Sequence, residues 1–145
     1  NVSIQVRKLG LTAPLLGGDG WDSVKLAEIG GASIEGSYFT NHYSHQNPAP
    51  QVQNFVAKYK TDYGQTPDGL AALGYDAARL LFDAMKRAGA LDGKTLAAAI
   101  AATKDFPGVT GTITIDAQRD AQKAAVVLEM KNGVPSYVTT IEPPK

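Results

Sequence analysis

One stretch of the chain, Pro14–Ser23, combines residue types that could bind a small ligand. Its sequence is PLLGGDGWDS, in which Asp19 has glycines on both sides. Glycines let the backbone turn sharply and let another group approach it closely. The leucines before them predict the end of a short buried strand, and open α/β sheets bind ligands at the carboxyl ends of their strands. The stretch therefore predicts a carboxylate that holds the positive group of a small molecule. The alternative is a strand-to-helix turn in which Asp19 only accepts hydrogen bonds from nearby backbone N–H groups.

Two other clusters have residue types that bind metal ions, but their context favours other roles. His42 and His45 are three residues apart, a spacing that suits a metal on a helix, yet their segment is rich in Asn, Ser and Pro. Asp116, Gln118 and Asp120 resemble part of a calcium loop that lacks its glycine and its distant glutamate. We therefore predict a hinge loop for the histidines, a solvated turn for the acidic residues, and no metal or cofactor.

Several function classes are not supported by the composition or by any motif. The GGDG sequence has neither GxGxxG nor a lysine followed by Ser or Thr, and its carboxylate would repel phosphate. No carboxylate pair and no Ser/His/Asp order predicts catalysis, so we do not expect an enzyme. The 145 residues carry 14 basic and 14 acidic side chains, so the net charge of zero argues against a nucleic-acid partner. The absence of cysteine excludes a disulfide and a thiolate nucleophile.

Helical and strand patterns alternate in the first third of the chain. Helical spacing begins at Val2 and stops at Gly10, so the chain starts at or inside a helix and is expected to be a piece of a longer protein. Asp22 or Ser23 is the predicted cap of a second helix. After the first helix, we expect a strand over Thr12–Leu16 and a helix over Val24–Ile29. A second strand is expected over Ile34–Phe39, with a continuation over Thr40–Ser44. The segment His45–Pro50 is expected to form a polar connection.

Three helices and then a set of strands follow. Apolar residues at helical spacing, with glycines or aspartates at the ends, predict helices over Val52–Tyr63, Asp68–Ala88 and Asp92–Lys104. These helices have no strands between them, so they need strands from elsewhere. Alternating polar and apolar residues then predict a strand over Phe106–Ile115, and two further β runs follow at Ala124–Lys131 and Val134–Ile141. Asn132-Gly133 predicts a two-residue hairpin turn between the last two strands, and the Pro-rich tail is expected to fray.

Five segments, in this order, resemble one family of binding proteins. They are LGLTAPLLGGDGWDS, AEIGGASIEGSYFTNHYS, VQNFVAKYKTDYGQTPDGLAALGYDAARLL, FPGVTGTITID and AAVVLEMKNGVPSYV. The family is that of branched-chain amino-acid ABC transporter substrate-binding proteins, the leucine/isoleucine/valine-binding group of type I periplasmic binding proteins. The resemblance runs from about Val6 to Val138 and corresponds to the C-terminal part of the family's chains. It implies an α/β fold of two Rossmann-like lobes, joined by three crossovers, that close on a ligand.

The resemblance also implies how this chain divides between the two lobes. Residues 1–39 fall in lobe 2, residues 40–123 in lobe 1, and residues 124–145 form a return hairpin of lobe 2, with hinge segments near Phe39–His42 and Lys123–Ala125. The upstream half of the same protein then supplies the strands that the helices lack. An isolated piece is expected to oligomerise, for example as a domain-swapped homodimer, because its sheet edges and helix faces lack partners.

Four residues are the ligand-binding candidates under this resemblance. Asp19 matches the acidic residue with which the family binds the α-ammonium group of an amino acid, and Trp21 is close enough to line the cleft. Leu70 falls near a position where the family often presents an aromatic side chain. Tyr75 lies further along the same helix, where it faces either the core, which we prefer, or the cleft.

The resemblance implies a periplasmic or otherwise exported protein. Such a protein captures an amino acid, branched-chain or similar, in its interlobe cleft and delivers it to the membrane permease of an ABC transporter. The alternative is a ligand-sensing domain of the same fold in a signalling receptor.

Overall fold

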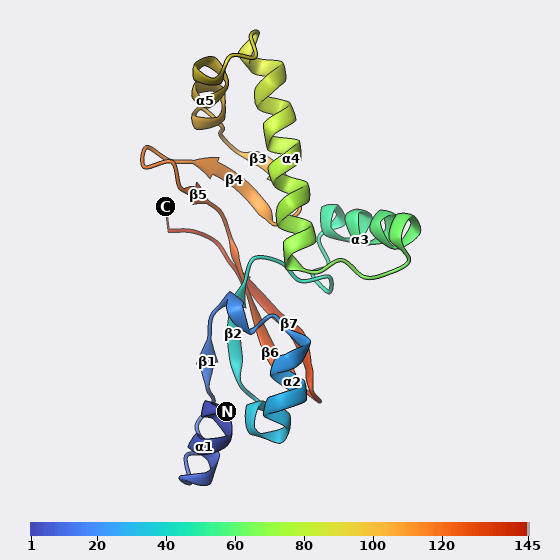
Figure 1. Cartoon of the computed structure of the whole chain (residues 1–145), viewed down its shortest axis with the longest axis vertical. Coiled ribbons are helices and arrows are strands. Elements are labelled where there is room, and N and C mark those ends of the chain that lie inside the picture. Colours follow the sequence, from blue (N-terminus) through green and yellow to red (C-terminus); the bar gives the residue numbers. More distant parts are fainter. Residues whose placement is uncertain (145) are drawn as a thin grey trace.

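The chain forms two units with separate hydrophobic cores, as a computed structural model of residues 1–144 describes (Figure 1). We call residues 1–41 and 125–141 the sheet unit, and residues 50–122 the helical unit. Segments 42–49 and 123–124 join them, and in Figure 1 the chain crosses between the units at a narrow waist. Lys145, the last residue of the predicted tail, lies outside the described residues.

The sheet unit is built on four strands in the order β1-β2-β6-β7, of which only the β1–β2 pair is parallel. Short helices and 3₁₀ turns connect or cover these strands. The elements are α1 (Val2–Lys8), β1 (Leu16–Gly17), the 3₁₀ turn η1 (Asp19–Trp21), α2 (Val24–Gly30), the 3₁₀ turn η2 (Gly31–Ile34), β2 (Tyr38–Asn41), β6 (Ala125–Lys131) and β7 (Val134–Ile141).

Alternate residues of β6 face the core of the sheet unit. Val126, Leu128 and Met130 are buried there with Ile34 and Phe39, and side chains from α2 pack against them. Burying one such side chain contributes about 1.5–3 kcal/mol, so this period-two pattern is a main source of the unit's stability. The strand predicted over Ala124–Lys131 is confirmed, with its start at Ala125.

The helical unit contains α3 (Pro50–Tyr63), α4 (Gly69–Ala88) and α5 (Gly93–Ala101). The Asp68 carboxylate accepts a hydrogen bond from the first turn of α4, and the Asp92 carboxylate accepts two from the first turn of α5. Gly64 and Gly89 end α3 and α4 in the left-handed conformation that favours glycine. The predicted starts of α4 and α5 and the predicted ends of α3 and α4 are therefore confirmed, whereas α3 begins at Pro50 instead of Val52.

The single strand predicted over Phe106–Ile115 is wrong. It is a tight hairpin of β3 (Phe106–Gly108) and β4 (Gly111–Ile115), paired in turn with the short β5 (Ala121–Gln122). The turn consists of Val109 and Thr110, both buried. Their backbone N–H groups donate hydrogen bonds to the carboxylate of Asp76 on α4, at 2.8 and 2.7 Å. The alternation of side chains continues through the turn, so it could not reveal where the chain reverses.

Three other predicted boundaries are also wrong. The first predicted strand, Thr12–Leu16, is reduced to β1, an edge strand on which Leu16 is 80% exposed rather than buried. Residues 31–34 form a 3₁₀ turn, so the second strand begins only at Tyr38. The last predicted helix ends at Ala101 instead of Lys104, because the Thr103 carbonyl accepts a hydrogen bond from Ile115 of β4.

The hairpin predicted at Asn132-Gly133 is confirmed. Lys131 pairs with Val134 across the turn, and both turn residues have positive φ. Beyond β7 the chain leaves the sheet unit, and Glu142 lines a small cavity together with residues of the β3–β4 turn. Among the described residues, no helix combines the length and apolar character needed to cross a membrane.

Candidate functional site

Asp19 lies at the carboxyl end of β1, where the sequence predicts a ligand-binding carboxylate. It is the first residue of η1, and its side chain is 65% exposed. The N–H groups of Trp21 and Asp22 donate to the backbone carbonyls of Gly18 and Asp19, at 3.0 and 2.9 Å. Within residues 1–144 the Asp19 carboxylate accepts no backbone hydrogen bond, so the local turn does not need it.

The side-chain partner of Asp19 is a histidine from the neighbouring strand. His42 Nε2 lies 3.1 Å from Asp19 Oδ2, and the two residues are 23 positions apart in the sequence. The contact follows from the parallel register, in which Gly17 pairs with Phe39, so that residues just beyond each strand meet at one edge of the sheet. Asp19 Oδ1 has no hydrogen-bond donor within the described part of the chain.

The helical unit approaches the sheet unit at the first residue of α4. A side-chain carbon on Gly69 would lie 3.1 Å from Asp22 Oδ2 and 3.5 Å from Asn41 Oδ1, so only glycine fits this approach comfortably. Leu70 follows directly and is 78% exposed. The start of α4 therefore lies close to the side chains of Asp22 and Asn41 in the sheet unit.

A groove of about 560 Å³ opens between the units at this point. Its wall includes Asp22 and Asp68 together with Asn41 and Met130, and no lysine or arginine lines it within residues 1–144. Burial, and then the nearby Asp68 carboxylate, raise the pKa of Tyr43, so its phenol stays protonated. The carboxylates at this junction favour a positively charged group over an anion.

Trp21 and Tyr75 lie in hydrophobic clusters on either side of the junction. The Trp21 ring covers Gly17 so closely that a side chain there would collide with it, and its centroid is 6.3 Å from that of Phe39. Gly17 thus makes room for an indole ring. The centroids of the Tyr75 and Phe55 rings are 4.8 Å apart. Tyr75 is 42% exposed and lies on the wall of a groove of about 610 Å³ between α3 and α4.

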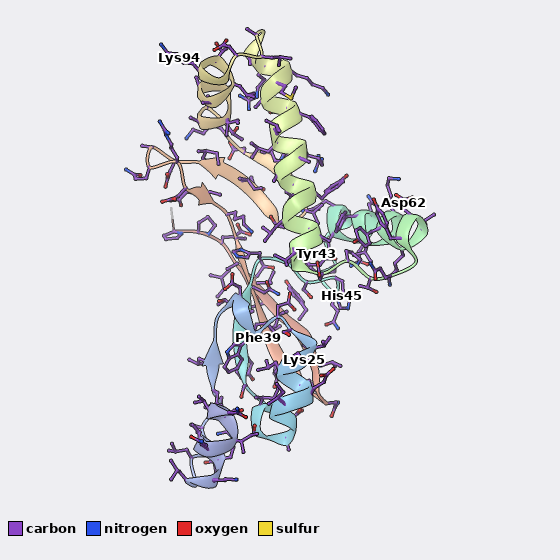
Figure 2. All side chains as sticks on the ribbon, viewed as in Figure 1. Lys25, Phe39, Tyr43, His45, Asp62 and Lys94 are labelled. Carbon is purple, nitrogen blue, oxygen red and sulfur yellow. The ribbon has the colours of Figure 1, made fainter. Side chains whose placement is uncertain are left out.

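Figure 2 shows the labelled side chains of the waist between the two units. Tyr43 and His45 lie on the connecting segment, directly above the sheet unit that carries Phe39 and Lys25. Partial burial, and then the charge of Lys60, lower the pKa of His45 below its ordinary value. His45 therefore stays neutral at pH 7, and it makes no contact with Asp19 among the described residues.

The sequence did not point to His42, Asp22 or Asn41 as neighbours of the candidate site. The available signal was topological, because parallel strands that are adjacent place the residues after them at the same edge. The predicted continuation of the second strand reached His42, but the sequence did not show that this strand pairs in parallel with the first strand. No group of three or more metal-ligating side chains occurs within residues 1–144.

Comparison with known proteins gives the family of this chain. The sequence profile of the family described as "Periplasmic binding protein" matches residues 1–134. The chain belongs to the periplasmic binding protein family. This finding confirms the resemblance on which the sequence-based expectations rest.

Three relatives show how far the similarity within the periplasmic binding protein family extends. A Leu/Ile/Val-binding protein homologue from Brucella suis is 31% identical over 124 residues, which are 86% of this chain and 33% of that protein. The crystal structure of the leucine-binding protein LivK from Thermotoga maritima has 44% identity and a TM-score of 0.88, and the match covers 98% of this chain and 41% of that one. The branched-chain amino-acid transporter substrate-binding protein LivJ from Streptococcus pneumoniae, solved with isoleucine, has 30% identity and a TM-score of 0.81 with the same coverage.

The chain therefore spans about a third of the curated relative and about two fifths of the two solved chains. All three relatives are named as binding proteins rather than enzymes. The predicted α/β architecture of the type I periplasmic binding proteins is confirmed for the part that this chain covers.

Proposed function

We propose that this chain is part of an exported solute-binding protein that captures an amino acid, branched-chain or similar, and delivers it to an ABC permease. The observation that carries the proposal is the Asp19 carboxylate, which stands at the carboxyl end of β1 without a role in the local turn. A ligand ammonium group that leaves water needs a charge partner and hydrogen-bond acceptors, and a carboxylate supplies both. The Leu/Ile/Val-binding relatives support this choice of ligand class.

The sheet unit and the helical unit are, in this proposal, parts of the two lobes that close on the ligand. Segment 42–49 and segment 123–124 act as hinges between them. Apolar side chains on α4, among them Leu81 and Phe82, are exposed in this chain, and we expect the upstream half of the protein to cover them. The same half is expected to supply the groups that bind the ligand carboxylate.

The remaining candidate residues have different roles in this proposal. Leu70, exposed at the start of α4, would contact the apolar side chain of the ligand when the lobes close. Trp21 stabilises the loop that carries Asp19 through its contact with Gly17, and Tyr75 packs against Phe55 between α3 and α4. Of the four candidates, Asp19 and Leu70 are the two that we expect to touch the ligand.

The test is calorimetric titration of the full-length protein with leucine, isoleucine and valine. Losing a hydrogen bond to a charged group costs about 1.5–3 kcal/mol, so Asp19→Asn should weaken binding by roughly 10- to 150-fold. Glu28→Gln is the matched control, because Glu28 is an exposed acid of the same unit that pairs with Lys25. Equal affinity of Asp19→Asn and the wild type would remove the basis of the proposal.

A further inference from the structure

We propose that His42 is a positioning residue of the ammonium site, where its imidazole holds the Asp19 carboxylate in the orientation that meets the ligand. This inference rests on the proposed function, since it concerns the same carboxylate. Neither the sequence motifs nor the family resemblance assigns a role to this histidine in ligand binding.

The first argument is that His42 is the side chain that holds Asp19. The His42 Nε2 to Asp19 Oδ2 distance is 3.1 Å, and no other side chain or backbone group within residues 1–144 bonds to that carboxylate. The two side chains are 42% and 65% exposed, so the contact lies at the opening between the units. Without the imidazole, the carboxylate of an exposed glycine-flanked turn would sample several rotamers.

The second argument is that the backbone beneath His42 is fixed. Its N–H group donates a hydrogen bond of 2.7 Å to the side chain of Asn41, which is buried at the end of β2. Tyr43, the next residue, is 4% exposed and belongs to the core of the helical unit. His42 therefore sits on a rigid anchor between the two units, and it can hold Asp19 in one orientation.

The third argument concerns the proton on the imidazole. A neutral ring can donate its Nε2–H to Asp19 Oδ2, and this leaves Oδ1 with no donor and open to the ligand ammonium. His42 thus engages one carboxylate oxygen of Asp19 and leaves the other for the ligand.

The test is calorimetric titration of the full-length protein with leucine, using two variants of His42. His42→Leu removes the group that holds the Asp19 carboxylate and should bind leucine about fivefold more weakly, since one ordinary hydrogen bond is lost. His42→Gln offers the carboxylate an N–H donor again and should recover part of the affinity that His42→Leu loses.

The protein has one other histidine, which supplies the control. His45→Leu should weaken binding less than His42→Leu, since within residues 1–144 the side chain that bonds to Asp19 is His42. If His42→Leu binds leucine as tightly as the wild type, or if His42→Gln binds no more tightly than His42→Leu, the inference is wrong although the proposed function stands. If the wild type binds no amino acid, the proposed function fails and this inference fails with it. Should His42→Leu not fold, as judged by its thermal transition, His42→Ala replaces it in the same comparison.

Discussion

The buried carboxylate of Asp76 gives the sharpest stability prediction. Asp76 lies on α4 with a side chain that is 3% exposed, and its two oxygens accept the N–H groups of Val109 and Thr110. Hydrogen bonds to a charged group contribute about 1.5–3 kcal/mol each, so the pair contributes about 3–6 kcal/mol. Asp76→Ala should lower the free energy of unfolding by that amount, because two buried donors then lack acceptors.

This loss is large compared with the total of about 5–15 kcal/mol that stabilises an ordinary domain. Asp76→Asn should lose about half as much, because its amide keeps one acceptor and turns a second donor toward an N–H group. The measurement is urea unfolding followed by circular dichroism. Hydrogen exchange should accelerate at the β3–β4 turn in both variants, since this turn loses its anchor on α4.

The matched control is Asp83, two turns further along the same helix. Its carboxylate pairs with Arg87 at 2.7 Å, but both side chains are more than one third exposed. An exposed pair of this kind contributes about 0–1 kcal/mol, so Asp83→Ala should change the stability little. A loss in Asp76→Ala no greater than that in Asp83→Ala would refute the argument that the carboxylate holds the turn.

Two further predictions concern the sheet unit and the waist. Gly17→Ala should destabilise the protein by about 1–3 kcal/mol in thermal unfolding, because its new carbon collides with the Trp21 ring, whereas Gly18→Ala meets no atom within 4 Å and should cost less. The pKa of His45 is lowered in the folded protein, so the unfolded chain takes up its proton first as the pH falls below 6.5. The free energy of unfolding, measured with urea, should therefore decrease from pH 7 to pH 5. The decrease should be smaller in His45→Gln. An equal decrease in both proteins would contradict the role given to His45.

Much of the fold could be predicted because its signals are local. Asp68 and Asp92 cap their helices through atoms two or three residues away, and Asn132-Gly133 forms its turn through its own backbone preference. The order of these local signals also carried the resemblance to the periplasmic binding proteins. The position of Asp19 at the end of a strand followed from the same kind of evidence.

The sequence by itself determined the helices, the closing hairpin and the carboxylate at the end of the first strand. The tertiary structure decided which distant groups meet: Asp76 with a turn 33 residues away, and Asp19 with a histidine 23 residues away. The physical reason is that caps and tight turns depend on atoms close along the chain. A buried hydrogen bond between segments depends on strand register and helix packing, which no short stretch of residues contains.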